Sequence, residues 1–321
     1  MVNIGVLGCS SFAERFVLPN ILELPEYFKL VGIASRSHDK ASQCAFKYHT
    51  TAYSPYESIL DISGIDAIYI PLPNSLHEEW IQKALNRGLH VLVEKPLATN
   101  AEAVRALNDF AKSRSLVLLE TFQFRFHSQL NWIMDKLQEG IIGDLRCIRS
   151  SFGFPPFPDP SNIRYCKELG GGSLLDAGVY PIKISQIFLG NAVSVTSACL
   201  HVDAKKGVDT WGGGFLKQKH GDLFSEIAFG FENHYQCSLD LWGSEGRLYT
   251  NRIFTAPPGF KPEVTIEQGS KKDIISLPED NHFKNMLMNF YHQIETKGDT
   301  HYQQNIDQAV LIDEFLRLSN R

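Results

Sequence analysis

Short apolar runs alternate with helical patterns along the first 120 residues of the chain. The apolar runs predict buried strands, and residues that repeat every three or four positions, such as Trp80, Ala84 and Leu85, predict helices between them. The predicted strands are 2–7, 29–34, 65–70, 90–93 and 116–119, and the predicted helices are 12–24, 101–113 and one that begins near 76 and ends at Gly88. Strands that alternate with helices pair in parallel through right-handed crossovers, so we expect a doubly wound α/β domain.

The rest of the chain has a different pattern. Helices are predicted at 128–139 and 173–189, a strand at 145–154 leads into a Pro-rich loop at 154–160, and several strand-like runs follow, among them 235–241. Two helices close the chain, and the first of them has its apolar face at Phe283, Met286, Leu287, Phe290 and Ile294 and ends at Gly298. Runs of strands with separate helices predict an α+β domain with a large, mostly antiparallel sheet. We place the boundary near 121, with a dinucleotide-binding domain at 1–121 and a substrate-binding and oligomerisation domain at 122–321.

Composition excludes several classes of protein. The 321 residues are 43% hydrophobic and 21% charged, and the net charge of −5 offers no electrostatic reason to expect nucleic acid or an anionic membrane as a partner. The N-terminus has no basic region before its apolar run, so no signal peptide is expected, and no apolar stretch reaches the roughly 20 residues of a membrane helix. The six cysteines are scattered without a CxxC pair, which favours a reduced cytoplasmic protein without a zinc site.

The turn after the first strand, Gly8-Cys9-Ser10-Ser11-Phe12-Ala13, has the form G-x-S-x-x-A. It is a variant of the dinucleotide fingerprint, in which small residues let the backbone approach a pyrophosphate at a helix N-terminus. Two of the usual glycines are replaced here, so an ordinary glycine turn is the alternative. The position, after an N-terminal strand and before a helix, favours the dinucleotide site.

The second strand ends at Ala34-Ser35-Arg36-Ser37, with Lys40 one turn later. A site selective for NAD usually has an acidic residue here to bind the ribose 2′-hydroxyl, and this chain has none. Hydroxyl groups and a guanidinium suit a 2′-phosphate, which predicts NADP(H), with NAD(H) as a possible second cofactor. A solvated loop arginine is the alternative.

Two further segments carry candidate chemistry. Glu94-Lys95-Pro96 follows the strand 90–93 directly, where a lysine can hold a ribose or substrate oxygen, although a surface turn is the alternative. In the segment 170–181, three glycines precede Asp176 and Tyr180, which share one helix face. A Tyr–Lys pair is a plausible acid–base unit, because an ammonium stabilises phenolate, while a buried structural tyrosine is the alternative.

Together these segments resemble the Gfo/Idh/MocA oxidoreductase family over nearly the whole chain. The family's segment after its fourth strand is similar to 69–77, its most specific signature to 94–96, the opening of its second domain to 120–127, and its substrate-domain helix to 170–180. The resemblance implies a Rossmann domain and hydride transfer between NADP(H) and a sugar-like substrate.

Tyr180 narrows the resemblance to one branch. Inositol dehydrogenase-like members carry histidine there, whereas glucose–fructose oxidoreductase, dihydrodiol and xylose dehydrogenases and nucleotide-sugar ketoreductases carry tyrosine. The start of the chain, with Arg15 and Leu18-Pro19, resembles most the 3-ketoreductases of deoxysugar pathways. The chain departs from the family at Gln123-Phe124-Arg125, often Met-Tyr-Arg, and at Ile163-Arg164, often Trp-Arg, both of which bear on the pocket wall.

The resemblance also implies a role for each site residue. Tyr180 exchanges the proton, Lys95 orients the substrate oxygen and tunes Tyr180, and Asp176 binds a substrate hydroxyl. Apart from the resemblance, a nucleotide diphosphate needs cationic or donor-rich contacts, and such residues cluster by sequence around the proposed pocket: Arg125, His127, Arg164 and Lys183. The alternative is that these charges face solvent or bind the cofactor's own phosphates. Arg125 and His127 are the residues expected at the substrate, and His127 is the second candidate for the acid. The residues expected to hold the cofactor are Gly8, Ser10, Ser11, Phe12, Ser35, Arg36, Ser37, Lys40, Pro71, Leu72, Asn74, His77, Glu94, Lys95 and Arg164. No metal is expected.

The predicted reaction is reduction of the 3-keto group of a nucleotide-linked deoxysugar. The alternatives are dehydrogenation of a free aldose or a trans-dihydrodiol, and a non-catalytic regulator that senses the cofactor, since a fold does not define a function. An antiparallel sheet with helices on one face leaves its other face to be covered, which predicts a homodimer or homotetramer.

Overall fold

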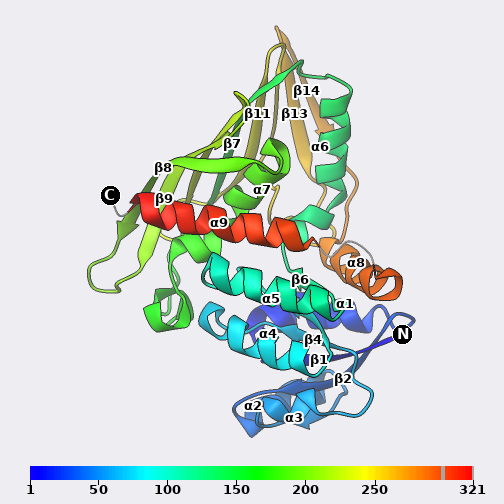
Figure 1. The fold of residues 1–321 in the computed structure, drawn as a ribbon. Coiled ribbons are helices and arrows are strands. Elements are labelled where there is room, and N and C mark those ends of the chain that lie inside the picture. Colours follow the sequence, from blue (N-terminus) through cyan, green and yellow to red (C-terminus); the bar gives the residue numbers. More distant parts are fainter. Residues whose placement is uncertain (298–300, 320–321) are drawn as a thin grey trace. The chain divides into compact units, whose positions relative to one another are not determined.

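The computed structural model describes residues 1–297 and 301–319, which form two compact units (Figure 1). The first unit comprises Met1–Thr121 with Phe283–Ile306, and the second comprises Phe122–His282 with Asp307–Arg321. The predicted fold class, a Rossmann domain followed by an α+β domain with a large, mostly antiparallel sheet, is confirmed. Gly298, the predicted end of a helix, lies outside the described residues.

The first unit is built on a six-stranded parallel sheet in the order β3-β2-β1-β4-β5-β6. The strand β4 is buried along its whole length, as expected for a parallel strand with both faces covered. In chain order the elements are β1 (Val2–Leu7), α1 (Leu18–Leu22), β2 (Phe28–Ala34), α2 (His38–Lys47), β3 (Ala52–Tyr53), α3 (Glu57–Leu60), β4 (Ala67–Ile70), α4 (His77–Asn86), β5 (His90–Val93), α5 (Ala101–Ser113) and β6 (Leu118–Glu120).

Local sequence explains most of these boundaries. Asn100 begins α5 by accepting a hydrogen bond from the backbone N–H of Ala103 at 2.8 Å, which satisfies one of the free donors at a helix N-terminus. Gly88 has φ +75° after α4, a conformation that glycine adopts without strain. The predicted helix 12–24 begins with a π-helical turn, Ala13–Val17, that continues into α1. The sequence analysis did not anticipate α2, β3 or α3.

The second unit is built on an eight-stranded sheet in the order β14-β13-β12-β11-β7-β10-β9-β8, antiparallel except for the pair β7 and β10. Helix α7 packs against one face of this sheet (Figure 1). The elements are α6 (Ser128–Gln138), β7 (Leu145–Gly153), α7 (Val179–Leu189), β8 (Val193–Val202), β9 (Asp209–Gln218), β10 (Phe224–Gly230), β11 (Gln236–Gly243), β12 (Arg247–Thr250), β13 (Glu263–Gln268) and β14 (Lys271–Ser276). Helix α7 is preceded by the π-helical turn Leu174–Gly178.

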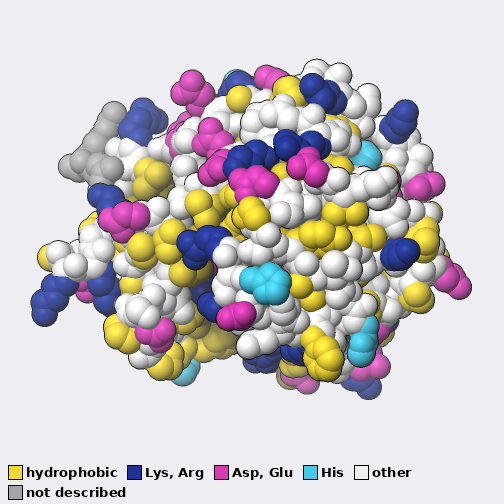
Figure 2. Space-filling model, turned by 90° about the horizontal axis from the view of Figure 1, so that it is seen from below, with side chains coloured by type: hydrophobic (Ala, Val, Ile, Leu, Met, Phe, Trp, Pro, Cys, Tyr) yellow, Lys and Arg dark blue, Asp and Glu magenta, His cyan; other side chains and the backbone are white. Residues whose placement is uncertain are grey.

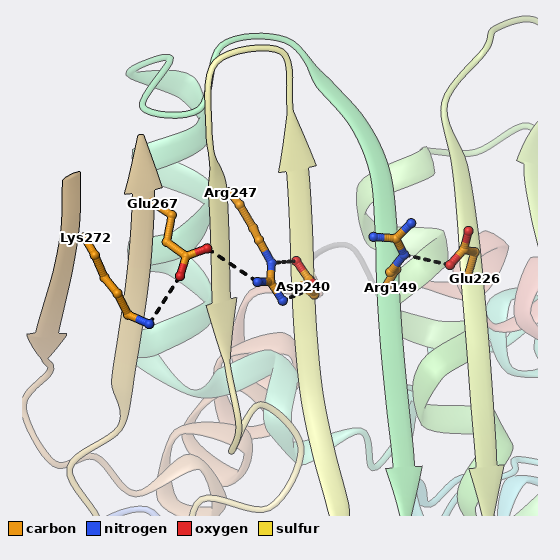
Figure 3. Close-up of polar contacts among 6 residues, drawn as sticks. All are labelled: Arg149, Glu226, Asp240, Arg247, Glu267 and Lys272. Atoms are coloured by element: carbon orange, nitrogen blue, oxygen red, sulfur yellow. Dashed lines mark hydrogen bonds and ion pairs between the residues drawn. The ribbon is translucent and has the colours of Figure 1, made fainter. Parts of the chain in front are cut away.

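The two faces of this sheet differ in chemistry. On β11, Cys237, Leu239 and Leu241 point into the apolar core, and the residues between them lie on the opposite face. That opposite face carries ion pairs between neighbouring strands (Figure 3), namely Arg149–Glu226 at 2.7 Å, Arg247–Asp240 at 2.7 Å, Arg247–Glu267 at 3.4 Å and Lys272–Glu267 at 3.3 Å. The side chains at both ends of these pairs are partly exposed, so each pair contributes little to stability.

The segment 283–306 corrects the expected domain division, which assigned everything after 121 to the second domain. Helix α8 (His282–Thr296) carries Phe283, which stacks on Phe16 with ring centroids 5.0 Å apart, and Tyr291, which packs edge-on against Tyr27 at 5.1 Å. Phe283, the first residue of the apolar stripe, and Tyr291 therefore pack against aromatic residues from the start of the chain. Helix α9 (Tyr302–Ser319) contributes residues to each unit.

Candidate active site

The turn after β1 has the backbone geometry that a dinucleotide fingerprint requires. Gly8 has φ +129°, and a Cβ at this position would lie 3.0 Å from Cδ2 of Leu72. Its N–H donates to the carbonyl of Ala34 at 2.9 Å, which ties the turn to the end of β2. Ser10 Oγ accepts from the N–H of Ala13 at 3.1 Å and orients the start of the helix. The turn therefore approaches its neighbours closely through backbone, as a pyrophosphate-binding turn does.

Ser11 and Phe12 differ in their surroundings within this turn. Ser11 is exposed, whereas the Phe12 ring packs against Phe16 at 5.2 Å and Phe283 at 5.9 Å between centroids. A cofactor contact at Phe12 would thus come from its backbone, because its ring already has an apolar environment.

At the end of β2, the two serines hold the backbone and the arginine is exposed. Ser35 Oγ accepts from the N–H of Ser37 at 3.3 Å, and Ser37 Oγ caps α2 by accepting from the N–H of Lys40 at 3.4 Å. Arg36 is exposed and interacts with the hydroxyl of Tyr56. Burial raises the pKa of Tyr56, and the charge of Arg36 opposes that shift. Arg36 is thus the cationic group at this edge, with Tyr56 as a partner that the sequence analysis missed.

His77, expected at the cofactor, has a buried position between two loops. The side chain is fully buried, with Nδ1 2.7 Å from the carbonyl of Pro96 and Nε2 2.8 Å from the carbonyl of Leu72. Burial lowers the pKa of this histidine. Its ring joins the loops after β4 and β5, so His77 positions those loops and offers no free atom to a cofactor. The expected residues Pro71 and Asn74 lie in the first of them.

Lys95 is the second residue after β5, in a loop that two carboxyl groups stabilise. Glu94 accepts from the hydroxyl of Tyr69 at 2.7 Å, and burial raises the pKa of its carboxyl against that hydrogen bond. Glu120, at the end of β6, accepts from the N–H of Leu97 at 2.9 Å. Tyr69 and Glu120, the first residues of two of the family-like segments, thus position the segment that carries Lys95.

Tyr180 lies near the start of α7 inside a shell of aromatic rings. Its side chain is only 5% exposed, and its hydroxyl lies 3.3 Å from Nε2 and 3.4 Å from Oε1 of Gln123. The rings around it, with centroid distances of 5.0 to 6.0 Å, belong to Phe122, Phe124, Phe152 and Phe254. Burial among these rings places the phenol in a site of low dielectric constant, where interactions with charge are strong.

Asp176 and Arg164 form an ion pair that the sequence did not predict. Arg164 Nε lies 2.7 Å from Asp176 Oδ2, and the aspartate side chain is 13% exposed. The glycine run before Asp176 has a packing reason, because a Cβ at Gly171 would lie 2.5 Å from the carbonyl oxygen of Arg164. A Cβ at Gly172 would meet the carboxylate of Asp209 at 2.3 Å. These glycines make room for the protein's own atoms.

Two other expected residues are buried in structural positions. His127 is fully buried and caps α6, its Nδ1 accepting from the N–H of Gln129 at 3.1 Å. Lys183 is 1% exposed, and its ammonium donates to Oε1 of Gln186 at 2.9 Å and lies 5.0 Å from the ring centroid of Phe122. In this structure neither side chain reaches the surface, and both contact neighbouring residues of the second unit. Arg125 is partly exposed beside the ring of Phe126.

Charges of both signs are mixed on the surface. Figure 2 shows Lys and Arg side chains interspersed with Asp and Glu, without a large patch of one sign on that face.

Within the described part of the chain, no group of three His, Cys, Asp or Glu side chains is arranged to hold a metal ion. Across residues 1–297 and 301–319, no helix combines the length and the apolar character needed to cross a bilayer.

Comparison with known proteins places this geometry in context. Residues 2–122 match the family described as "Oxidoreductase family, NAD-binding Rossmann fold", and residues 132–249 match "GFO/IDH/MocA C-terminal domain". A dTDP-3,4-didehydro-2,6-dideoxy-alpha-D-glucose 3-reductase from Saccharopolyspora spinosa is 40% identical over 91% of this chain and 87% of its own length. A D-xylose 1-dehydrogenase (NADP(+)) from Haloferax volcanii is 30% identical over 92% of this chain and 90% of its own length.

A solved structure is similar over the whole chain. The 3-ketoreductase from Actinomadura kijaniata, in complex with NADP and TDP-benzene, has a TM-score of 0.95 and 34% identity, covering 99% of this chain and 97% of its own. Crystal structures of a tyrosine-to-phenylalanine variant and a lysine-to-alanine variant of that enzyme are also similar to this chain.

Proposed function

The chain belongs to the Gfo/Idh/MocA family of oxidoreductases, and we propose that it reduces the 3-keto group of a nucleotide-linked deoxysugar with NADPH. One observation carries this proposal: the fold of a 3-ketoreductase that binds NADP and a TDP compound extends over the whole of this chain at 34% identity. The reductase from Saccharopolyspora spinosa, at 40% identity, supports the same substrate class.

The residues of the first unit fit NADP(H). The positive φ of Gly8 and the short side chain of Ser10 suit a pyrophosphate at the turn after β1, and exposed Arg36, with Lys40 nearby, suits a 2′-phosphate. When bound, this cofactor supplies or accepts the hydride. Ser11, Pro71, Leu72, Asn74 and Glu94 remain proposed contacts, and Ser35 and Ser37 support the site by holding its backbone.

Tyr180 is the proposed proton donor to the substrate oxygen. Its hydroxyl lies beside the side-chain amide of Gln123, and four phenylalanine rings pack around the tyrosine ring. Reduction of a ketone leaves an alkoxide that must gain a proton, and a phenol serves this step better when a cation stabilises the phenolate. We assign that cationic role, and the orientation of the substrate oxygen, to Lys95.

Asp176, Arg164 and Arg125 are the proposed polar contacts of the substrate. In this structure Arg164 forms an ion pair with the carboxylate of Asp176. A sugar hydroxyl that binds this carboxylate would therefore either add a contact to the ion pair or compete with Arg164. Arg164 therefore acts on the substrate side through Asp176, whereas the sequence analysis counted it among the cofactor residues.

We further propose that a second copy of the chain covers the outer face of the eight-stranded sheet. Trp211 and Phe215 are each 44% exposed on this face, Trp211 stacks on His201, and the ion pairs of Figure 3 lie on the same face. Exposed aromatic side chains of this kind are enriched in protein interfaces. Phe215→Lys should reduce the mass measured by light scattering to that of a monomer, while Phe46→Lys, on α2, should not.

We place the enzyme in the cytoplasm because all six cysteines are free thiols, and disulfides are rare in that compartment.

The experiment that tests the reaction compares substrates. NADPH oxidation is followed with a nucleotide-linked 3-keto-deoxysugar, and NADP⁺ reduction with free xylose, free glucose and a trans-dihydrodiol. We expect the nucleotide-linked substrate to have the highest kcat/KM, because binding energy from a remote group supports the reacting end. Efficient oxidation of a free sugar, with no gain from a nucleotide, would favour the dehydrogenase alternative, which the xylose dehydrogenase relative supports. No turnover of any carbonyl, with NADPH still bound, would favour a regulator.

A further inference from the structure

Two cysteines lie together at the edge of the first unit. Cys9 sits in the turn after β1, between Gly8 and Ser10, and is partly exposed. Its Sγ lies 3.7 Å from the carbonyl oxygen of Lys40 in α2. Cys44 is one helical turn after Lys40 on the same helix and is only 4% exposed. The turn and the helix therefore bring two thiols to one place from positions 35 residues apart in the sequence.

The two thiols interact and have unequal acidity. The hydrogen bond with Cys44 is the main cause that lowers the pKa of Cys9, and Ser35 and Lys40 act in the same direction. The same hydrogen bond, with burial, raises the pKa of Cys44. The accessible member of the pair is thus the better nucleophile, since the thiolate is the reactive form, and the buried member remains a thiol beside it.

We propose that Cys9 and Cys44 are a redox modification site, at which a hydroperoxide such as hydrogen peroxide joins them in a reversible disulfide. In the first step the Cys9 sulfur attacks one peroxide oxygen, the O–O bond breaks, and water leaves after protonation, so Cys9 becomes a sulfenic acid. In the second step the Cys44 sulfur attacks the Cys9 sulfur, the S–O bond breaks, and a second water leaves. Two thiols are oxidised and one peroxide is reduced, and a dithiol reverses the change.

The consequence of this disulfide rests on the proposed cofactor site. Cys9 lies between the two residues proposed to meet the pyrophosphate, and Ser35 next to it supports the loop that carries Arg36. A covalent bond from the turn to α2 would constrain the backbone of the turn at Cys9. The oxidised enzyme should therefore lose NADP(H) affinity, and bound NADP(H) should protect Cys9 from the peroxide.

The first measurement is chemical and needs no cofactor. The purified full-length chain is treated with hydrogen peroxide, remaining thiols are blocked, and peptides are mapped by mass spectrometry without reduction. We expect a cross-linked peptide containing Cys9 and Cys44 that disappears on treatment with dithiothreitol. Cys44→Ala should abolish the cross-link and leave the activity of the reduced enzyme unchanged, whereas Cys199→Ala, at an exposed cysteine on β8, should not affect the cross-link. Free Cys44 after complete oxidation of Cys9 would overturn the proposal.

The second measurement connects the disulfide to the cofactor. NADPH binding is titrated in the reduced, oxidised and re-reduced enzyme, and the rate of cross-linking is measured with and without NADPH. We expect binding to weaken by about tenfold or more on oxidation, the size of one lost charge-assisted contact, and to recover after reduction. Equal affinity of the reduced and disulfide forms would overturn the regulatory consequence. Failure of the reduced enzyme to bind NADPH would instead refute the proposed function, while the cross-linked peptide still decides the redox site.

Discussion

The cofactor edge of the first unit and the Tyr180 shell of the second unit are built in different ways. At the edge, the side-chain hydrogen bonds that shape the site join residues two or three positions apart, as in Ser10 with Ala13 and Ser35 with Ser37, and the backbone hydrogen bond from Gly8 to Ala34 follows from the pairing of β1 with β2. Around Tyr180, the amide partner Gln123 is 57 residues away, and Phe254 comes from beyond the next five strands. One site is local backbone geometry and the other is long-range packing.

This difference predicts how each site responds to substitution. A side chain that contacts the cofactor at this edge can be removed while the backbone of the turn keeps its shape. The substitution should therefore weaken cofactor binding by the loss of one contact and leave the rest of the site intact. A side chain in the shell sets the position and surroundings of the reacting hydroxyl, so its loss should alter the chemical step. Four substitutions test this contrast, in order of expected effect.

Tyr180→Phe should have the largest effect. It keeps the ring within the aromatic shell and removes only the proton, so kcat should fall by a factor of about 10² or more while NADPH affinity changes little. Steady-state kinetics together with NADPH titration measure both. Tyr165→Phe is the matched control, because the Tyr165 hydroxyl accepts from the N–H of Phe157 in the same unit. Near-normal turnover in Tyr180→Phe would move the acid role to another residue.

Arg36→Ala should act on binding alone. Loss of a charge-assisted phosphate contact costs about 1.5–3 kcal/mol, which corresponds to roughly tenfold to a hundredfold weaker NADPH binding. NADH binding should change far less, since NADH lacks the 2′-phosphate. Arg87→Ala, which removes an exposed arginine paired with Asp61 in the same unit, controls for net charge. Equal weakening of both cofactors by Arg36→Ala would contradict NADP selectivity.

His282→Gln should reveal how much the buried His282 contributes to the loss of folding stability at low pH. Burial lowers the pKa of His282 to about 3, and His127 packs against it at 5.6 Å between ring centroids. Because the folded pKa lies below the unfolded value near 6.5, stability is fully present above pH 6.5 and falls as the pH drops toward 3. Wild-type protein should lose about 2 kcal/mol through this group by pH 5.

Urea unfolding at pH 7 and pH 5 measures that loss. The His282→Gln variant should lose less between the two pH values than the wild type, and His234→Gln, at an exposed histidine, should lose as much as the wild type. Parallel pH dependence in the wild type and in His282→Gln would show that this buried histidine is not the origin of the acid sensitivity.

Gln123→Leu should have the smallest effect. Gln123 is only 3% exposed, and the variant replaces its amide, which lies beside the Tyr180 hydroxyl, by an apolar side chain that still fills the buried site. A neutral hydrogen bond has a net value of about 0.5–1.5 kcal/mol, which predicts a fall in kcat of roughly two- to tenfold. The pH profile of kcat should shift with it, because the amide holds the hydroxyl that exchanges the proton. An unchanged profile would leave Gln123 with a packing role only.

The candidate residues fall into two groups, those whose position could be predicted from the sequence and those whose position could not. The fingerprint turn and the serine-rich loop could be predicted because their geometry depends on residues next to one another in the chain. His77 and His127 were interpreted as ligand contacts, whereas the structure places both in the interior. A histidine has the same appearance in sequence whether its ring faces a ligand or two buried carbonyl groups, so only the packed structure distinguishes the two.

The chain's own pattern of apolar and polar residues predicted the α/β and α+β halves. Its contiguous motifs indicated the oxidoreductase family, and the resemblance to that family implied Tyr180 as the candidate acid. Those conclusions depend on periodicity and on motifs that are contiguous in the sequence. Tertiary structure alone decided that α8 belongs to the first unit, that Arg164 pairs with Asp176, and that Cys9 meets Cys44. Each of these contacts joins residues at least 12 positions apart, and such pairs are chosen by the packing of whole elements, which no local pattern encodes.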